Sequence, residues 1–255
     1  GSQLLGGFYN AGEIQNGLQN FGVSVVDSIV QGGLTNTGRI IHAVPTDSGG
    51  TGGAVRVRGY GTLSGGLFNS GAISSVTSGI QVDNNGLIQG GVTNSLGGLI
   101  DGGFVGIGLW GGSLSGGVNN FGTLYGTVAG LFLGGSGTSD ATIQQGVTNA
   151  GLISGGQAGI ALSNGALIGG GLTNTGEIRG AKGIHIDVGR LEGGLVNAGT
   201  ISNIYLQNGQ ITGVTAISGS VGSVITSGVT NAGIIAGTSG VAINHQGTAT
   251  TLNNS

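Results

Sequence analysis

The sequence of 255 residues contains no cysteine and no methionine, a single proline (Pro45) and a single tryptophan (Trp110). Without cysteine the chain has neither a disulfide framework nor a thiolate metal site. A single proline excludes a collagen-like helix, which needs abundant proline as well as a glycine at every third position. No apolar run approaches the about 18 residues that a membrane-spanning helix requires, so we expect no membrane insertion by this segment.

Charge is also scarce. Charged residues make up 6% of the chain, with six Lys and Arg, nine Asp and Glu, and a net charge of −3. So few basic residues cannot neutralise a run of phosphates, and no nucleic-acid partner is expected. The carboxylates are scattered along the chain, whereas polysaccharide-cleaving enzymes need them clustered. The sequence therefore predicts no enzymatic activity, no cofactor and no metal site.

Glycine is abundant, at 63 residues. Such a content is typical of disordered, low-complexity chains. Disordered chains, however, are poor in aliphatic residues and rich in charge. Because 37% of this chain is hydrophobic, it can bury a core.

An octet recurs along the chain: Gly, an apolar residue, any residue, Asn, any residue, Gly, any residue, and Ile or Leu. Clear copies begin at Gly33 and Gly171. A second pattern, Gly-Ile-x-aliphatic, lies between octets, as at Gly79 and Gly183. The central asparagines of the octets are mostly about 25 residues apart, a period typical of solenoids; they are Asn10, Asn36, Asn69, Asn94, Asn120, Asn149, Asn174, Asn197 and Asn231.

Each repeat contains short apolar runs with period-two alternation, which predicts strands. Glycine at this density disfavours helices, so we expect essentially none. A unit of three short strands matches one turn of a parallel β-helix, whose stacked coils bury each other's apolar faces. We therefore predict an all-β, single-stranded parallel β-helix of about nine coils of roughly 25 residues. It forms one solenoid over 1–255, with repeats over about 6–236, loop insertions near 41–54 and 212–226, and a final coil or tail at 237–255.

Alternation places Leu172, Asn174 and Ile178 toward the core and the residues between them toward solvent. A buried amide needs hydrogen-bond partners. Stacked asparagines provide them if each side-chain carbonyl accepts from the amide of the next coil, so we predict a structural Asn ladder. The Gly two residues after each Asn is expected to supply a positive φ at the corner.

Two segments are candidate ligand-binding sites. In the segment 41–61, Arg56 and Arg58 alternate with Tyr60 and could hold a sugar acid or another carboxylate; an ordinary surface strand is the alternative. In the second segment, His185 and Asp187 share one face of a predicted strand and could hydrogen-bond. They belong to a charged cluster that is either a recognition patch or a solvated face with local ion pairs; it comprises Glu177, Arg179, Lys182, His185, Asp187, Arg190 and Glu192.

The outward residue before each Asn is often threonine, as at Thr35 and Thr173, but Tyr9, Phe68 and Val196 interrupt the row. These interruptions disfavour the flat threonine array of an ice-binding β-helix. The same weakly charged face is suited to lateral self-association.

The copies at 170–180 (GGLTNTGEIRG) and 193–202 (GGLVNAGTIS) resemble the Asn-Gly repeats of bacterial autotransporter passenger domains, with filamentous haemagglutinin-like secreted adhesins as the nearest rival. The resemblance implies a right-handed β-helix at the outer cell surface or in the extracellular space. It also implies the passenger region alone, because no signal sequence or translocator barrel is recognised. We therefore expect a structural and adhesive stalk segment that binds itself, or a host or cell-surface glycan or protein. A carbohydrate-binding or carbohydrate-active β-helix and a passive spacer are the alternatives.

Overall fold

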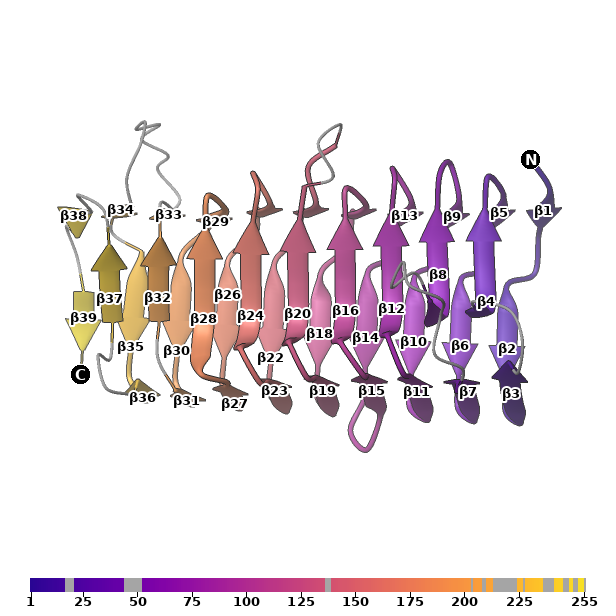
Figure 1. Ribbon diagram of the computed structural model, residues 1–255, viewed down its shortest axis with the longest axis horizontal. Helices are drawn as coiled ribbons and strands as arrows, with labels where there is room; N and C mark the ends of the chain where they lie inside the picture. The colour runs from indigo at the N-terminus through magenta and orange to yellow at the C-terminus, as the bar shows by residue number, and fades with distance from the viewer. Residues whose placement is uncertain are drawn as a thin grey trace.

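The computed structural model is a rod of stacked β-coils whose strands form four parallel sheets, with the two termini at opposite ends (Figure 1). It describes residues 1–16, 21–43, 52–135, 139–202, 204–207, 210–212, 224–226, 228–235, 241–244, 248–249 and 252–254. These residues form strands, turns and bends but no helix. The predicted all-β parallel solenoid is therefore confirmed.

The strands of one sheet come from successive coils, so that each strand pairs with its counterpart in the next coil. Sheet A contains β1 (Gln3–Leu4), β5 (Ile29–Val30), β9 (Thr62–Leu63), β13 (Leu87–Ile88), β17 (Ser113–Leu114), β21 (Thr142–Ile143), β25 (Leu167–Ile168), β29 (Arg190–Glu192), β33 (Gln210–Thr212), β34 (Val224–Thr226) and β38 (Thr248–Ala249). Sheet B contains β2 (Phe8–Asn10), β6 (Leu34–Asn36), β10 (Leu67–Asn69), β14 (Val92–Asn94), β18 (Val118–Asn120), β22 (Val147–Asn149), β26 (Leu172–Asn174), β30 (Leu195–Asn197), β35 (Val229–Asn231) and β39 (Leu252–Asn254).

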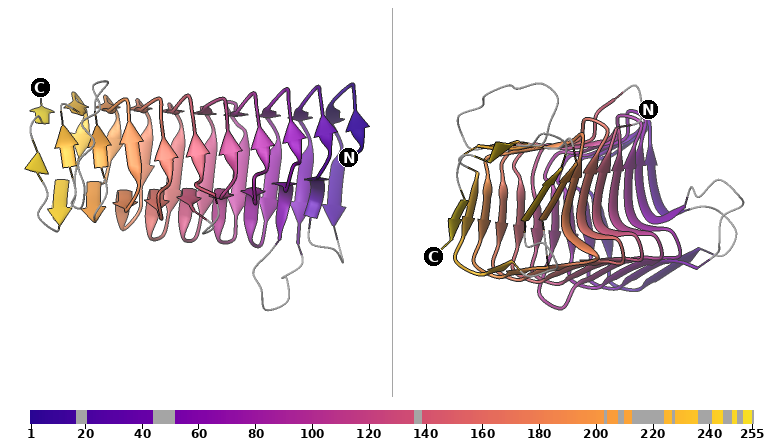
Figure 2. Two further views of the ribbon diagram at one scale, coloured as in Figure 1. Left: turned by 90° about the horizontal axis from the view of Figure 1, so that it is seen from above. Right: turned by 60° about the vertical axis from the view of Figure 1, so that its left-hand side comes forward.

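Sheets A and C line two opposite edges of the rod, and sheets B and D form the sides between them (Figures 1 and 2). Sheet C contains β3 (Glu13–Asn16), β7 (Arg39–His42), β11 (Ala72–Ser75), β15 (Leu99–Gly102), β19 (Thr123–Gly126), β23 (Leu152–Gly155), β27 (Glu177–Arg179), β31 (Thr200–Ile201) and β36 (Ile234–Ile235). Sheet D contains β4 (Phe21–Val26), β8 (Gly53–Arg58), β12 (Ser78–Asp83), β16 (Val105–Trp110), β20 (Ala129–Gly134), β24 (Ala158–Ser163), β28 (Lys182–Asp187), β32 (Ile204–Gln207) and β37 (Val241–Asn244).

A coil thus has four strands, where the sequence predicted three. The additional strand is the short one of sheet A, such as β13, which lies between two turns. Two residues are too few to show period-two alternation, so this strand leaves no periodic signal in the sequence.

The segments predicted as insertions or tail are described in part. Residues 44–51, within the insertion near 41–54, and residues 213–223, within that near 212–226, lie outside the described residues. β34 falls in the second insertion and pairs with β33, so that sheet A has 11 described strands where sheet B has ten. The segment 237–255 contains β37, β38 and β39, which extend sheets D, A and B.

Stacks of aliphatic side chains fill the interior. Leu172, Asn174 and Ile178 are buried, as alternation predicts, and Thr173 and Thr175 are exposed. Removing each aliphatic side chain from water contributes about 1.5–3 kcal/mol, so stability comes from the stacking of coils. The stack of sheet C shows the regularity, because all of its members between the partly buried Ile14 and Ile235 are fully buried: Ile40, Ile73, Ile100, Leu124, Ile153, Ile178 and Ile201.

The predicted Asn ladder is present. Nδ2 of each ladder asparagine from Asn10 to Asn197 donates to Oδ1 of the asparagine one coil later, at 2.6 to 2.9 Å. The expected direction is wrong, because each carbonyl accepts from the preceding coil. The reason is that Nδ2 also reaches backbone oxygens on that side; Asn36 Nδ2, for example, lies 3.1 Å from the Ala72 oxygen. Backbone register also aligns Asn254, which the repeat search missed, with Asn231.

The role predicted for the glycine after each Asn is also wrong. Gly38 has no positive φ. An added Cβ there would instead collide with the carbonyl oxygen of Gly12 in the preceding coil, so glycine at this corner permits close stacking. Positive φ occurs instead at most of the glycines that open the octet, such as Gly33 (φ 74°).

Candidate functional site

Both candidate segments contribute to the outer face of sheet D. Residues that pair in register on successive strands form a column along the rod. Arg56 on β8, Phe132 on β20 and His185 on β28 belong to one column of outward-facing residues. Arg58 and Asp187 lie in the neighbouring outward column. Five inter-strand steps separate β8 from β28, or about 24 Å at the usual strand spacing. Residues more than a hundred positions apart in the sequence thus share one side of the rod.

Tyr60 does not join this face. Gly59 adopts a positive φ of 64° and turns the chain away after β8. The Tyr60 side chain is 82% exposed, and its backbone N–H donates to Asp27 Oδ1 at 3.0 Å. The predicted alternation on one face therefore holds for the two arginines but not for Tyr60.

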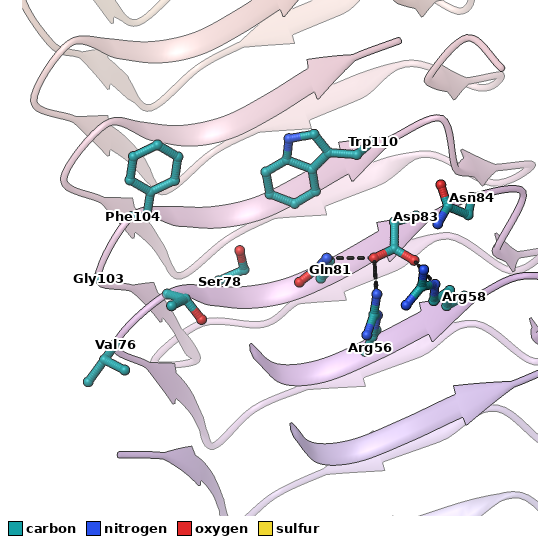
Figure 3. A pocket seen from close by; sticks show the side chains of 11 residues that line it. Arg56, Arg58, Val76, Ser78, Gln81, Asp83, Asn84, Gly103, Phe104 and Trp110 are labelled. Carbon is teal, nitrogen blue, oxygen red and sulfur yellow. Dashed lines mark hydrogen bonds and ion pairs between the residues drawn. The ribbon is translucent and has the colours of Figure 1, made fainter. Parts of the chain in front are cut away.

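A groove of about 590 Å³ lies on this face, between β8, β12, β16 and the turns that precede β12 and β16. Its lining has an apolar end with Val76 and Phe104 and a polar end with Arg58, Asp83 and Asn84 (Figure 3). The volume is within the range of clefts that hold small organic ligands, roughly 300–1,000 Å³. We refer to it below as the sheet D groove.

Asp83 organises the polar end. Its Oδ2 accepts from Arg56 Nε at 3.0 Å, from Arg56 Nη2 at 2.7 Å and from Gln81 Nε2 at 2.5 Å. The Arg56 guanidinium also lies 4.4 Å from the centre of the Phe21 ring. Arg56 is therefore buried and has its charge neutralised, which leaves it a structural role.

The other oxygen, Asp83 Oδ1, is buried and has no hydrogen-bond partner among the described residues. Arg58 Nε lies 3.6 Å from it, beyond hydrogen-bond range. With the Asn84 amide oxygen facing Arg58, that oxygen accepts from Arg58 Nε at 3.2 Å and from Nη2 at 3.1 Å. An unpartnered buried carboxylate oxygen costs free energy, and a bound ligand, ion or water is one way to satisfy it.

Aromatic rings form one wall of the groove and continue beyond it. The Trp110 indole lies over Gly108, and the Phe132 ring lies over Gly134, so that a Cβ at either glycine would meet the ring. The ring centroids are 5.5 Å apart with an interplanar angle of 36°. Both side chains are half-buried and offer part of a ring face to a ligand.

A smaller hollow of about 170 Å³ lies on the far side of Phe132 and includes Ser163, His185 and Asp187 in its lining. Burial lowers the pKa of His185, the Lys182 charge lowers it further, and Asp187 acts in the opposite direction. His185 Nε2 and Lys182 Nζ lie 3.3 Å apart. At neutral pH this histidine is therefore mostly uncharged.

The charged cluster at 177–192 does not form one patch. β27, β28 and β29 carry it onto sheets C, D and A in turn. The pairs Arg179–Glu177 and Arg190–Glu192 are solvated contacts at 3.5 Å. The interpretation as solvated faces with local ion pairs describes these two pairs, whereas His185 and Asp187 face the small hollow.

Neither Trp110 nor Phe132 is among the candidate residues predicted from the sequence. A signal was available, because each aromatic residue lies two positions from a glycine within the second repeat pattern, where most other coils carry small or polar residues; Val26 and Tyr205 are exceptions. The meaning of this signal depends on register, which pairs Gly108 with Phe132 and Gly134 with Trp110 on neighbouring strands.

Within the described residues, no group of three or more His, Cys, Asp or Glu side chains is placed to hold a metal ion. The same residues contain no helix long and apolar enough to cross a membrane. Comparisons with protein-family models, curated proteins and solved structures gave no match. The geometry of the sheet D face and the repeat pattern are therefore the indicators of function in this chain.

Proposed function

We propose that this chain is a non-enzymatic, adhesive rod segment of a secreted bacterial surface protein, of the autotransporter-passenger type, and that the outer face of sheet D is its contact surface. In this proposal the solenoid is right-handed, has about nine coils and is displayed at the outer cell surface. Its partner is a glycan or protein of another cell surface. The Asn-Gly repeats and the parallel solenoid support this assignment.

The observation that carries the proposal is the gathering of ligand-type side chains on one side of the rod. Arg58, Asp83, Trp110, Phe132 and His185 come from separate coils and lie along sheet D. Aromatic side chains beside polar groups are enriched at protein binding surfaces. An extended face of this kind suits contact along the rod.

The test displays the chain on a non-adherent bacterium through an unrelated scaffold and measures retention on cultured epithelial cells. The double variant Trp110→Ala/Phe132→Ala is compared with Tyr125→Ala, which removes an exposed aromatic side chain from β19 of sheet C. We expect retention by the unmodified chain and by Tyr125→Ala, and its loss in the double variant. If both variants are retained equally, sheet D is not the contact surface. If even the unmodified chain is not retained, the adhesive function is contradicted and the passive spacer is the remaining interpretation.

Lateral self-association is a second candidate, which the outward column of sheet B favours. Its residues pair in register along the rod and carry no charge: Tyr9, Thr35, Phe68, Thr93, Asn119, Thr148, Thr173, Val196 and Thr230. Two rods can therefore approach through this face without charge repulsion. Sedimentation velocity over a wide concentration range tests this candidate; a sedimentation coefficient that does not change with concentration rules it out.

A further inference from the structure

We propose that the sheet D groove is a saccharide-binding site for a neutral pyranose, with the sugar stacked on Trp110 and its hydroxyls between Asp83 and Arg58. This inference rests on the proposed function, because it names the ligand class for the same contact face. It is argued from four features of the groove, taken in turn.

The first feature is the unpartnered Asp83 Oδ1. The Asp83 side chain is only 7% exposed, and its Oδ1 accepts no hydrogen bond from any described residue. Oδ2 already has its donors from Arg56 and Gln81. A carboxylate oxygen can only accept, so any further partner must be a donor, which a ligand in the groove can supply. A sugar hydroxyl is such a donor, and it carries no charge into the site.

The second feature is Arg58, which lies beside that oxygen. Its side chain is 45% exposed and is held by Asn84 and, at 3.6 Å, by Asp83. An exposed arginine can rotate to admit a hydroxyl, and its five N–H groups exceed the two bonds to Asn84. Vicinal hydroxyls of a pyranose can then donate to Asp83 Oδ1 and accept from Arg58, which satisfies both residues.

The third feature is the apolar lining. The half-buried Trp110 ring is fixed over Gly108, and Val76 and Phe104 lie at the other end of the groove (Figure 3). The face of an indole carries partial negative charge and attracts the weakly positive C–H groups of a pyranose ring. A ligand that combines an apolar ring face with a rim of hydroxyls therefore matches both ends of the groove.

The fourth feature is the Asp83 carboxylate beside Arg58, which favours a neutral sugar over a sugar acid. The Arg56 charge is neutralised by Asp83 and covered by Phe21. Arg58 shares its charge with the same carboxylate. The two guanidiniums and the one carboxylate leave a net charge of +1, carried by the exposed Arg58. A ligand carboxylate that reached Arg58 would, however, also lie close to Asp83 Oδ1, whereas a hydroxyl can donate to that oxygen. The expectation of a sugar acid at Arg56, Arg58 and Tyr60 is replaced here by a neutral pyranose at Arg58, Asp83 and Trp110.

The chain contains its own probe, because Trp110 is the only tryptophan. Cellotriose, maltotriose, chitotriose and N-acetyllactosamine are titrated while Trp110 emission is recorded, with a trigalacturonate as the acidic comparison. We expect a saturable change in Trp110 emission with at least one neutral sugar. Its affinity should differ little between 50 mM and 500 mM salt, because a neutral sugar forms no ion pair with the protein. Calorimetry measures the same affinity for variants that lack the indole.

Arg58→Gln and Trp110→Ala should each weaken binding by about tenfold or more, because each leaves part of the ligand without its partner. Arg39→Gln and Tyr125→Ala, on sheet C, are the matched controls and should bind as the unmodified chain does. Thermal melting of every variant verifies that it is folded. The proposal is overturned if no neutral sugar saturates, if only the trigalacturonate binds and salt abolishes its binding, or if folded Arg58→Gln binds normally.

Competition separates this inference from the proposed function. A free sugar that binds in the titration should also release the bacteria that display the chain from the epithelial cells. If cells adhere through sheet D but no sugar binds or competes, the saccharide inference fails and the adhesive proposal stands. If sugar binds to the groove but displayed cells do not adhere, the adhesive proposal fails and the saccharide inference stands.

Discussion

Replacement of Asn120, in the middle of the Asn ladder, tests whether the ladder stabilises the rod by directional hydrogen bonds or by filling space. Its Nδ2 donates to Asn149 Oδ1 at 2.8 Å and to the Leu152 oxygen at 3.0 Å, and its Oδ1 accepts from Asn94 Nδ2 at 2.9 Å. In Asn120→Ala, Asn94 Nδ2 keeps two backbone acceptors. Asn149 Oδ1 loses its ladder donor inside the core, which together with the small void costs about 2–4 kcal/mol.

Asn120→Asp keeps the side-chain volume but reverses the hydrogen-bond pattern at one atom. The second carboxylate oxygen takes the place of Nδ2, where it faces the oxygens of Asn149, Gly122 and Leu152 at about 3 Å. A buried charge next to three acceptors costs more than a void, so we expect Asn120→Asp to lose about 4 kcal/mol or more at pH 7. At acidic pH the protonated group can donate, and the difference from Asn120→Ala should narrow.

The assay is urea denaturation followed by far-ultraviolet circular dichroism and by Trp110 fluorescence; agreement of the two probes verifies a single transition. Asn119→Ala is the matched control, since Asn119 lies on the same strand with its side chain outward, and it should change the free energy of unfolding by no more than about 0.5 kcal/mol. The reasoning is refuted if Asn120→Asp is as stable as Asn120→Ala at pH 7, because space filling would then outweigh hydrogen-bond direction.

Three further predictions concern single positions. Gly38→Ala should destabilise the rod by at least about 2 kcal/mol in urea denaturation because its Cβ meets the preceding coil, whereas Gly12→Ala, with open space around the added atom, should be close to neutral. Val188 has a φ of 55°, which is strained for a β-branched residue. Val188→Asn should therefore raise the free energy of unfolding by about 1 kcal/mol, seen as a higher melting temperature. Val26 has no positive φ, so Val26→Asn should not raise the melting temperature. Burial of His42 lowers its pKa below the unfolded value of about 6.5. The neutral imidazole therefore contributes its full stabilisation above about pH 6.5, and this stabilisation is lost as the pH falls toward the folded pKa. Between pH 7 and pH 5 the His42→Gln variant should therefore lose less free energy of unfolding than the unmodified chain; an equal loss would contradict the assignment.

The fold was predictable because each octet has the same residue type, asparagine, at the same inward position. A buried amide once per coil is stable only when it is paired with its own copy, so Asn174 and its counterparts indicate stacking in register as well as strand direction. The fourth strand was not predictable, because Leu87 and Ile88 alone show no period. The role of Gly38 was misassigned because the approach of another coil is a tertiary property, which the local sequence does not encode.

The candidate site was predictable only in pieces. Arg58 and His185 were identified by composition, because charge is scarce in this chain. Whether Arg58 and His185 lie on one face depends on the number of residues in each coil between successive strands of sheet D. That number cannot be read from the sequence, because the spacing between ladder asparagines is irregular. The unpartnered oxygen of Asp83 and the seat of Trp110 over Gly108 are three-dimensional relations between side chains, and no spacing in the sequence reveals them.

The constant direction of the amide bonds from Asn10 to Asn197 gives the rod an electrical polarity. Hydrogen bonds between parallel strands point both ways along the stacking axis and largely cancel. The side-chain amides all point the same way, so their dipoles add, as peptide dipoles do in a helix. The two ends of the rod therefore differ in potential independently of its few ionised groups.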